Sequence, residues 1–405
     1  MKAAFLTLGC KLNYAETSTY ERGLCAAGYE TVDWSEKADV YVINTCTVTA
    51  TSDAKSRNLV RKAHRCNPDA AIYVVGCSAS LRPSDYEGLP GVRKVFGCNE
   101  KSSLVPHICS KPCPEAPEVF GAYSVGERTR AFLKVQDGCD NYCKYCTVPY
   151  ARGHSRNIPI EECVRYAREI AATGTREIVL TGVNTGDFGR STSETFLGLL
   201  KALNEVEGIE RYRISSIEPN LLSDEIIDWI ASGTKFLPHF HIPLQSGSDR
   251  ILKEMGRRYT TGFFASKIEY IRERFAPADV FFGIDVMAGL PGESEEDFES
   301  EIRFLETIRP AFIHVFPYSR RPGTPAASMP CQVREEVKRK RVERLEALSS
   351  RLHAEFVGRN RGKIAKVLWE SKEKDGTMGG YTENYIRVSR PYDAALAGKT
   401  SDYEI

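Results

Sequence analysis

The feature that most constrains the fold of this chain is a regular alternation of short apolar runs with amphipathic stretches. Over the N-terminal part the order is AFLTLG, AETSTYERGLCAAG, DVYVINT, SDAKSRNLVRKAHR and AIYVVG. This order predicts strand, helix, strand, helix, strand. Strands connected by helices pair in parallel through right-handed crossovers. Residues 1–108 are therefore expected to form a parallel-sheet α/β domain.

A second alternation begins near residue 131 and continues to residue 332. Its apolar runs are AFLKVQ, EIVLTG, RYRISS, HFHIPL, VFFGIDVM and AFIHVFPY, with helical stretches between them. Six such repeats predict a partial (β/α)6 barrel, open on one side. In barrels of this kind the chemistry takes place at the C-terminal ends of the strands.

Three further segments complete the expected α/β architecture. Residues 109–130 are rich in proline and turn residues, which is typical of a linker between domains. Residues 333–355 form a charged amphipathic pattern and predict a connecting helix. Residues 356–405 contain short strand patterns and predict a small antiparallel β-barrel.

Composition narrows the class of protein. The formal net charge is +1, so any contact with nucleic acid depends on a local basic patch. No run approaches the ~18 apolar residues that span a membrane, and MKAAFLTLGC fits a strand better than a secretion signal. We expect a cytoplasmic protein, and there thirteen cysteines indicate metal, cluster or redox roles rather than disulfides.

Three cysteines follow the first predicted barrel strand at C-x3-C-x2-C spacing: Cys139, Cys143 and Cys146. A structural zinc ion needs four ligands, and the nearest further candidate, His154, fits no familiar zinc spacing. A four-iron cluster with one iron free of protein ligands is the better interpretation.

This trio, with the aromatic Tyr145 before its last cysteine, resembles the radical S-adenosylmethionine (SAM) superfamily. The resemblance implies that the amino and carboxylate groups of SAM bind the open iron. It also implies that electron transfer into the sulfonium yields a 5′-deoxyadenosyl radical, which abstracts hydrogen. The central segment is then a radical SAM barrel.

Polar and glycine residues at successive strand ends match the places where that superfamily contacts SAM. Glycine lets the backbone approach a ligand, and amide and carboxylate side chains offer hydrogen bonds. Each segment alone also fits an ordinary strand-to-helix turn. Together with Tyr145, the expected SAM contacts are Gly182, Asn184, Ser216, Glu218, Gln245, Gly247 and Gly289.

A second trio, Cys10, Cys46 and Cys77, closes three successive apolar runs of the N-terminal domain. Since the C-terminal ends of parallel strands meet at one edge, these thiols are expected in one crevice. Cys25 and Cys66, on predicted helices, fit ordinary core positions. Cys98 also follows a predicted strand, and geometry alone does not exclude it as a ligand.

The motifs LGCKLNYAET, NTCTVT, VVGC and GGYTENYIRV, with the radical SAM trio between them, resemble the methylthiotransferase family over nearly the whole chain. The resemblance implies a second four-iron cluster on Cys10, Cys46 and Cys77, and it gives Cys98 no counterpart. It also implies that residues 356–405 are a TRAM domain that binds RNA. The aromatics of that segment, such as Trp369, Tyr381 and Tyr385, more often fill the core of a small barrel than stack on bases.

The family replaces an aromatic C–H bond with C–S–CH3. One SAM methylates a sulfur bound to the N-terminal cluster, and a second SAM generates the radical that activates carbon 2 of an adenine. The sequence GCKLN differs from the GCQMN and GCPKN of two other subgroups. Together with SSIEP and YTENY, it resembles the subgroup that acts on threonylcarbamoyladenosine at position 37 of tRNA. The implied partners are tRNA, an electron donor of flavodoxin or ferredoxin type, and an unidentified sulfur donor.

Other functions remain open at this point. Within the family, the substrate could be isopentenyladenosine in tRNA or a ribosomal protein. A radical SAM enzyme inserting sulfur into a small carboxylated substrate would not need the C-terminal segment, and a non-catalytic RNA-binding protein would not need the open iron. For a threonylcarbamoyl carboxylate, the candidate partners are Arg152, Arg156 and Arg320.

Overall fold

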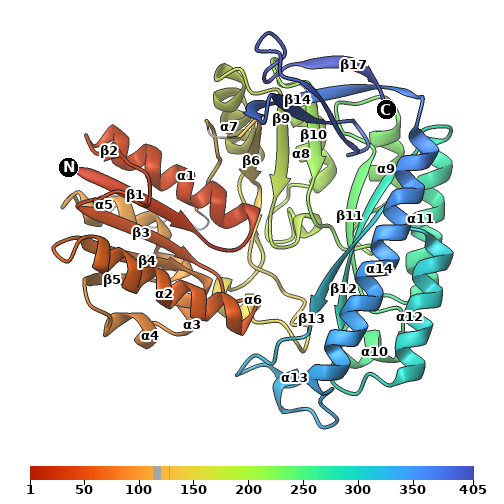
Figure 1. The fold of residues 1–405 in the computed structure, drawn as a ribbon, viewed down its shortest axis with the longest axis horizontal. Coiled ribbons are helices and arrows are strands. Elements are labelled where there is room, and N and C mark those ends of the chain that lie inside the picture. The colour runs from red at the N-terminus through yellow and green to blue at the C-terminus, as the bar shows by residue number, and fades with distance from the viewer. Residues whose placement is uncertain (113–119, 127) are drawn as a thin grey trace.

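A computed structural model describes residues 1–112, 120–126 and 128–405, so part of the expected linker lies outside the described residues. The N-terminal part is a five-stranded parallel sheet with the order β2-β1-β3-β4-β5. Its strands are β1 (Lys2–Thr7), β2 (Glu30–Thr31), β3 (Val40–Thr45), β4 (Ala71–Gly76) and β5 (Val92–Phe96). Figure 1 shows this sheet, in red and orange, beside the rest of the molecule.

Helices cover both faces of this sheet, which explains why β3 is buried along its whole length. The helical elements are α1 (Lys11–Ala26), α2 (Ala50–Cys66), α3 (Cys77–Leu81), α4 (Ser84–Glu87), η1 (Cys98–Ser103) and α5 (Leu104–Ile108). Val60 and Ala63 of α2 pack on Tyr41 and Ile43 on one face. On the other face the apolar side of α1 packs against Val40 and Val42.

The central part is the expected open barrel. Two parallel three-stranded sheets, β10-β9-β6 and β11-β12-β13, are joined by a bridge between Tyr212 and Phe236. The strands are β6 (Arg130–Lys134), β9 (Glu177–Thr181), β10 (Arg211–Ile214), β11 (His239–Gln245), β12 (Phe281–Ala288) and β13 (Phe312–Pro317). The prediction of a six-stranded partial barrel is confirmed.

The barrel helices lie on the outside, and several begin at a Ser or Thr that accepts a backbone N–H, as in Thr195, Ser223, Ser248, Thr260 and Ser294. The outer and connecting elements are α7 (Ile160–Ala172), α8 (Phe196–Asn204), α9 (Asp224–Ala231), α10 (Asp249–Glu254), α11 (Thr261–Phe275), α12 (Glu295–Ile308), α13 (Pro325–Ser328), η2 (Thr185–Asp187), α6 (Val148–Arg152), and the short strands β7 (Gln136–Asp137) and β8 (Arg156–Asn157). No helix of the described part of the chain is both long and apolar enough to cross a membrane.

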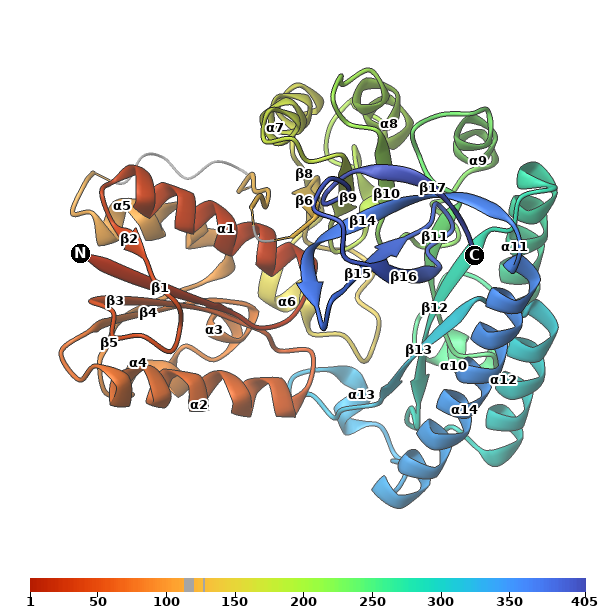
Figure 2. The ribbon, with the colours of Figure 1, turned by 45° about the horizontal axis from the view of Figure 1, so that its top comes forward.

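The connecting helix is α14 (Glu335–Asn360), and it continues through the boundary expected at residues 355 and 356. Leu345, Leu348 and Leu352 pack it against the barrel core. After it comes a four-stranded antiparallel sheet, a half-barrel with the order β16-β15-β14-β17. Its strands are β14 (Ile364–Lys374), β15 (Thr377–Tyr381), β16 (Arg387–Pro391) and β17 (Thr400–Glu404). Figure 2 shows it between α1 and α14.

The contact between this sheet and the barrel depends on the carboxylate of Glu177. Glu177 of β9 is fully buried and accepts hydrogen bonds from Arg211 and Arg213 of β10 at 2.5–2.8 Å. The two guanidinium groups then donate to main-chain oxygens of the C-terminal sheet and its loop, on Lys366, Tyr381, Thr382 and Glu383, at 2.8–3.2 Å. The C-terminal sheet is thus held by two arginines that Glu177 orients.

Candidate functional site

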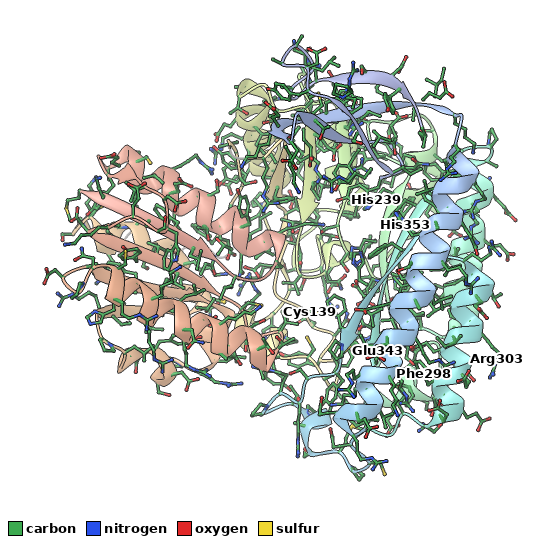
Figure 3. The ribbon with its side chains drawn as sticks, in the orientation of Figure 1. Cys139, His239, Phe298, Arg303, Glu343 and His353 are labelled. Atoms are coloured by element: carbon green, nitrogen blue, oxygen red, sulfur yellow. The ribbon has the colours of Figure 1, made fainter. Side chains whose placement is uncertain are left out.

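Cys139, Cys143 and Cys146 lie on the loop between β7 and α6. Figure 3 shows Cys139 near the centre of the molecule. The loop turns back sharply at Gly138, where φ is +72° and an added Cβ would lie 1.9 Å from the carbonyl oxygen of His154. The Cys139 N–H donates to the Gly153 oxygen at 3.1 Å, which closes the loop. The cysteine loop is therefore fixed by its own backbone.

The three thiols are close enough to affect one another. Burial, together with the charge of neighbouring Cys143, raises the pKa of Cys139 and of Cys146 to about 12. Buried thiolates this close together need a bound cation, which a cluster iron provides. The donor set therefore fits a four-iron cluster on three cysteines.

A further residue, Arg257, contacts this trio, and no motif or spacing marks it. Arg257 follows α10 and donates to the Cys143 sulfur at 3.1 Å and to the Tyr145 hydroxyl at 3.4 Å. It also pairs with Glu218 and donates to Tyr259, whose hydroxyl donates to the Pro243 oxygen at 2.6 Å. Glu218, an expected SAM contact, thus forms an ion pair with the arginine that donates to the Cys143 sulfur.

The residues at the end of β9 leave one polar atom without a partner. The Gln136 side-chain oxygen accepts the N–H groups of Val183 and Asn184 at 3.0 and 2.9 Å. It lies 2.9 Å from where a Cβ on Gly182 would be, so this approach needs glycine. The Asn184 amide donates to Asp187 at 3.0 Å, while its oxygen is buried and has no partner among the residues that the structure describes. A buried, unpaired acceptor is what a ligand donor would satisfy.

The other expected SAM contacts are less clearly placed. Gln245 ends β11 with a left-handed φ of +71°, and the Ser216 oxygen accepts from the Thr185 hydroxyl at 2.9 Å. A Cβ on Gly247 would lie 2.5 Å from Cα of Glu301, and one on Gly289 would lie 2.3 Å from Cγ of Lys338. At both glycines the close approach is to a helix, so contact with SAM remains a prediction.

The second trio lies at the end of the N-terminal sheet. Cys10 precedes α1, Cys46 follows β3 and Cys77 begins α3. The residues before Cys46 and Cys77 are paired in register, Thr45 with Gly76. Burial raises the pKa of Cys46, and the charge of Cys10 adds to this. Adjacent strands therefore bring these thiols to one edge, and the donor set fits a second cluster.

Cys77 has two neighbours that the sequence did not pair with it. It packs with Cys98, and a hydrogen bond between the two thiols raises the pKa of Cys77. Arg152 of α6 donates through Nε to the Cys77 sulfur at 3.1 Å. Since α6 begins two residues after Cys146, one short helix connects the radical SAM trio to a cysteine of the second trio.

Arg152 belongs to a buried group of charges, which we name the interface network: Glu16, Lys101, Lys134, Asp137 and Arg152, all at most 2% exposed. The Glu16 carboxylate accepts from Lys101, Lys134 and Arg152 at 2.7, 2.8 and 3.3 Å. Asp137 accepts from Lys134 at 2.6 Å and from Arg152 at 2.8 Å. Three cations face two carboxylates, and the remaining positive charge lies beside the Cys77 sulfur.

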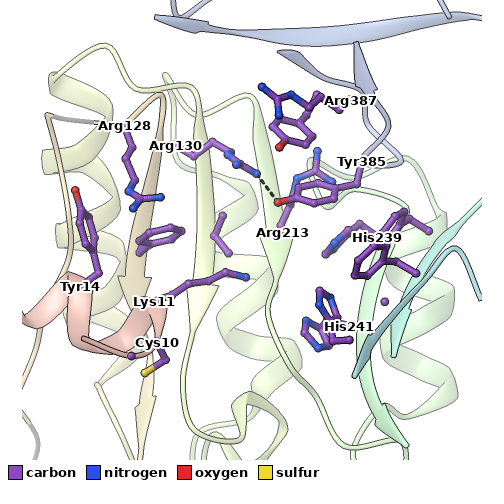
Figure 4. A pocket seen from close by; sticks show the side chains of 18 of the residues that line it. Cys10, Lys11, Tyr14, Arg128, Arg130, Arg213, His239, His241, Tyr385 and Arg387 are labelled. Carbon is purple, nitrogen blue, oxygen red and sulfur yellow. Dashed lines mark hydrogen bonds between the residues drawn. The ribbon is translucent and has the colours of Figure 1, made fainter. Parts of the chain in front are cut away.

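A cavity of about 710 Å³ lies where the three parts of the chain meet. It is lined by Cys10 and Lys11 from the N-terminal part, by the barrel strands, and by Tyr381, Tyr385 and Arg387 from the C-terminal segment. Figure 4 shows the Lys11 side chain reaching into it, with Cys10 at its base. Five Lys or Arg side chains line it, and no Asp or Glu does so among the described residues.

The arginines expected to bind a substrate carboxylate do not line this cavity. Arg152 is buried in the interface network, and Arg156 donates to the Arg152 oxygen at 3.0 Å. Arg320 lines a separate pocket near Tyr150. Of the aromatics expected in the core of the C-terminal segment, Trp369 is fully buried there, whereas Tyr381 and Tyr385 line the cavity.

Comparison with known proteins agrees with the fold described above. The radical SAM superfamily matches residues 133–305, and the uncharacterized protein family UPF0004 matches residues 2–97. A radical SAM methyltransferase from Kitasatospora setae, TsrM, has the same fold, with a TM-score of 0.59 at 15% identity, over 80% of this chain and 77% of that one. The fold and the cysteine loop define a radical SAM enzyme.

Two relatives show to which family of radical SAM enzymes the chain belongs. The chain is 40% identical to the threonylcarbamoyladenosine tRNA methylthiotransferase MtaB of Bacillus subtilis, over 95% of this chain and 89% of the relative. It is 32% identical to the tRNA-2-methylthio-N(6)-dimethylallyladenosine synthase of Carboxydothermus hydrogenoformans, over 97% and 94% of the two chains. The protein belongs to the radical SAM methylthiotransferase family, whose members use SAM and a four-iron cluster.

Proposed function

We propose that this protein adds a methylthio group to carbon 2 of threonylcarbamoyladenosine at position 37 of tRNA, and that it carries two four-iron clusters to do so. The observation that supports this most directly is the Arg152 contact. Arg152 is the last residue of α6, the short helix that begins two residues after Cys146, and it donates to the Cys77 sulfur. One residue therefore connects the segments that carry the two cysteine trios.

In this proposal Cys139, Cys143 and Cys146 hold the radical SAM cluster, and Cys10, Cys46 and Cys77 hold the second. A cluster with one open iron supplies the electron that cleaves bound SAM to a carbon radical. Arg257 positions the Cys143 sulfur through its hydrogen bond and links it to Glu218. Asn184 has a free buried oxygen that can accept from SAM.

The alternatives fit less well. A dimethylallyl substituent carries no charge, whereas the cavity is lined by cations and a threonyl group ends in a carboxylate. A small-molecule substrate would not need the C-terminal sheet, yet Tyr381, Tyr385 and Arg387 of that segment form part of the cavity wall. A non-catalytic RNA-binding protein would not need Arg257 on the Cys143 sulfur, nor its pair with Glu218. The proposed setting is the cytoplasm, with tRNA as substrate and a flavodoxin or ferredoxin as electron donor.

The test is mass spectrometry of nucleosides from the tRNA of a strain that lacks this gene. The 2-methylthio form of threonylcarbamoyladenosine should disappear and return with wild-type protein, but not with Cys10→Ala. The purified Cys10→Ala variant should lose iron yet still cleave SAM when reduced, because the radical SAM trio is intact. If the nucleoside is unchanged in the deletion strain, the proposed substrate is wrong.

A further inference from the structure

The cavity between the three parts of the chain has a positively charged wall, which the net charge of the chain does not explain. The whole chain is nearly neutral, with 55 Lys or Arg against 54 Asp or Glu. The cavity nevertheless has Lys11, Arg128, Arg130, Arg213 and Arg387 in its wall, without a carboxylate among the described lining residues. A site with this charge attracts an anion.

Two of these cations already have partners within the protein, although the one carboxylate they share does not cancel both charges. Arg213 is bound to Glu177 and to oxygens of the C-terminal segment. Arg130 donates to the Tyr385 hydroxyl at 3.1 Å and lies 4.0 Å from the same Glu177. These two arginines therefore hold the wall of the cavity together.

Lys11 differs from them. Within the described part of the chain its ammonium makes no hydrogen bond and no ion pair. Asp285, the carboxylate that attracts it through the cavity wall, already bonds His241 Nε2 at 2.7 Å. Figure 4 shows the side chain extended into the cavity. An uncompensated ammonium in a partly enclosed space is poised to bind an anionic ligand group.

The position of Lys11 also fixes where that anion lies. Lys11 is the first residue of α1 and directly follows Cys10, which lines the same cavity. An anion bound to Lys11 is therefore part of the base being modified, or is close to it. The stacked rings of Tyr381 and Tyr385, 4.7 Å apart, offer an aromatic surface on the opposite wall.

A metal ion is the competing occupant. His241, Asp285 and His314 present ligand atoms within 4.8 Å of one another at this cavity. The nearby charges argue against it, because Lys11, Arg130 and Arg213 would all repel a divalent cation. The His241–Asp285 pair instead fixes the wall next to the ammonium.

We propose that Lys11 binds the carboxylate of the threonylcarbamoyl group and so selects adenosine that already carries this modification. This inference rests on the proposed function. A charge-assisted hydrogen bond of this kind changes affinity by about ten- to a hundredfold. A backbone phosphate of the anticodon loop has similar chemistry, and the experiment below separates the two sources.

The experiment measures binding of the cluster-reconstituted protein, without reductant, to anticodon stem-loops by fluorescence anisotropy. One stem-loop carries threonylcarbamoyladenosine at position 37, a second carries adenosine, and a third carries the methyl ester of the threonyl group. Wild-type protein should prefer the first over the other two by about ten- to a hundredfold. Lys11→Met should bind all three alike, and Lys11→Arg should keep most of the preference.

Arg387→Met is the matched control, since Arg387 lines the same cavity from β16, far in sequence from either trio. It should weaken all three RNAs equally. If Lys11→Met also weakens all three equally, Lys11 binds phosphate and the proposal is overturned. An unchanged preference in Lys11→Met overturns it as well.

The methyl ester makes the test independent of any mutant's folding or cluster content. If wild-type protein binds the ester as tightly as the acid, carboxylate recognition is excluded. The proposed function is judged separately by the nucleoside analysis. If the protein transfers the methylthio group in cells but does not bind the acid more tightly than the ester, only the role of Lys11 is refuted and the proposed function stands.

Discussion

The interface network and the cavity both lie where the N-terminal part meets the barrel, and both are rich in cations. They differ in whether those cations are paired with carboxylates. In the interface network every charged group has a partner within 3.3 Å and is hidden from solvent. In the cavity Lys11 and Arg387 have no ion pair within the described part of the chain and are exposed. Paired charges join the two domains, and unpaired charges are left for a ligand.

This contrast predicts which substitutions affect stability and which affect binding. A buried charge that loses its partner is costly to leave in place, whereas a cation without a partner can be removed at little cost. Three stability measurements sharpen the comparison, in addition to the RNA binding described above.

The largest effect is expected for Glu16→Gln. The substitution leaves Lys101, Lys134 and Arg152 facing Asp137 alone, and it should lower the free energy of unfolding by about 3–5 kcal/mol. Denaturant unfolding of the purified protein measures this. Glu343→Gln, in an exposed pair with Arg339 on α14, is the control and should leave the midpoint unchanged. Equal effects of the two variants would show that the interface network does not hold the domains.

Acid should weaken the same network. Burial alone would raise the pKa of Glu16, but Lys101, Lys134 and Arg152 outweigh burial and lower it to about 2, from an ordinary 4.5. Because the folded-state pKa is the lower one, this stabilisation is complete above about pH 4.5 and is lost as the pH falls toward 2. It amounts to roughly 3 kcal/mol. Unfolding measured across this range should show a shallower decline in Glu16→Gln than in wild type, and parallel curves would contradict the assignment.

The smallest effect is expected for Arg387→Gln. Because Arg387 has no ion pair in the described part of the chain, its removal should change the free energy of unfolding by no more than about 0.5 kcal/mol. Affinity for tRNA should fall even so. A loss of stability comparable to that of Glu16→Gln would mean that the cavity cations are structural, and the contrast between the two regions would fail.

Much of the fold follows from local pattern. The two strand and helix alternations predicted the parallel sheet and the open barrel, because each apolar run is long enough to be one buried strand. The cysteine trio after the first barrel strand predicted the radical SAM class, because C-x3-C-x2-C is a local spacing. The helix α14 ends at Asn360, five residues beyond the boundary expected at residue 355, because it continues through Gly358.

The contacts between distant segments could not be predicted in the same way. Arg257 lies beside Cys143, and Arg152 beside Cys77, only because separate elements pack together. No periodicity marks such pairs. The same limit explains why Arg152 looked available for a substrate carboxylate, although two carboxylates and a thiol occupy it, and why Lys11 drew no attention as an isolated lysine.

The attachment of the C-terminal sheet has a consequence for the order of folding. Arg130, Glu177 and Arg211 are aligned in register across β6, β9 and β10, three strands separated in sequence by helices. The main-chain acceptors of the C-terminal segment meet fixed guanidinium groups only after these strands have paired. Docking of the C-terminal segment therefore depends on the earlier pairing of β6, β9 and β10, and the cavity wall formed by Tyr381 and Tyr385 closes only on a barrel whose first half is already built.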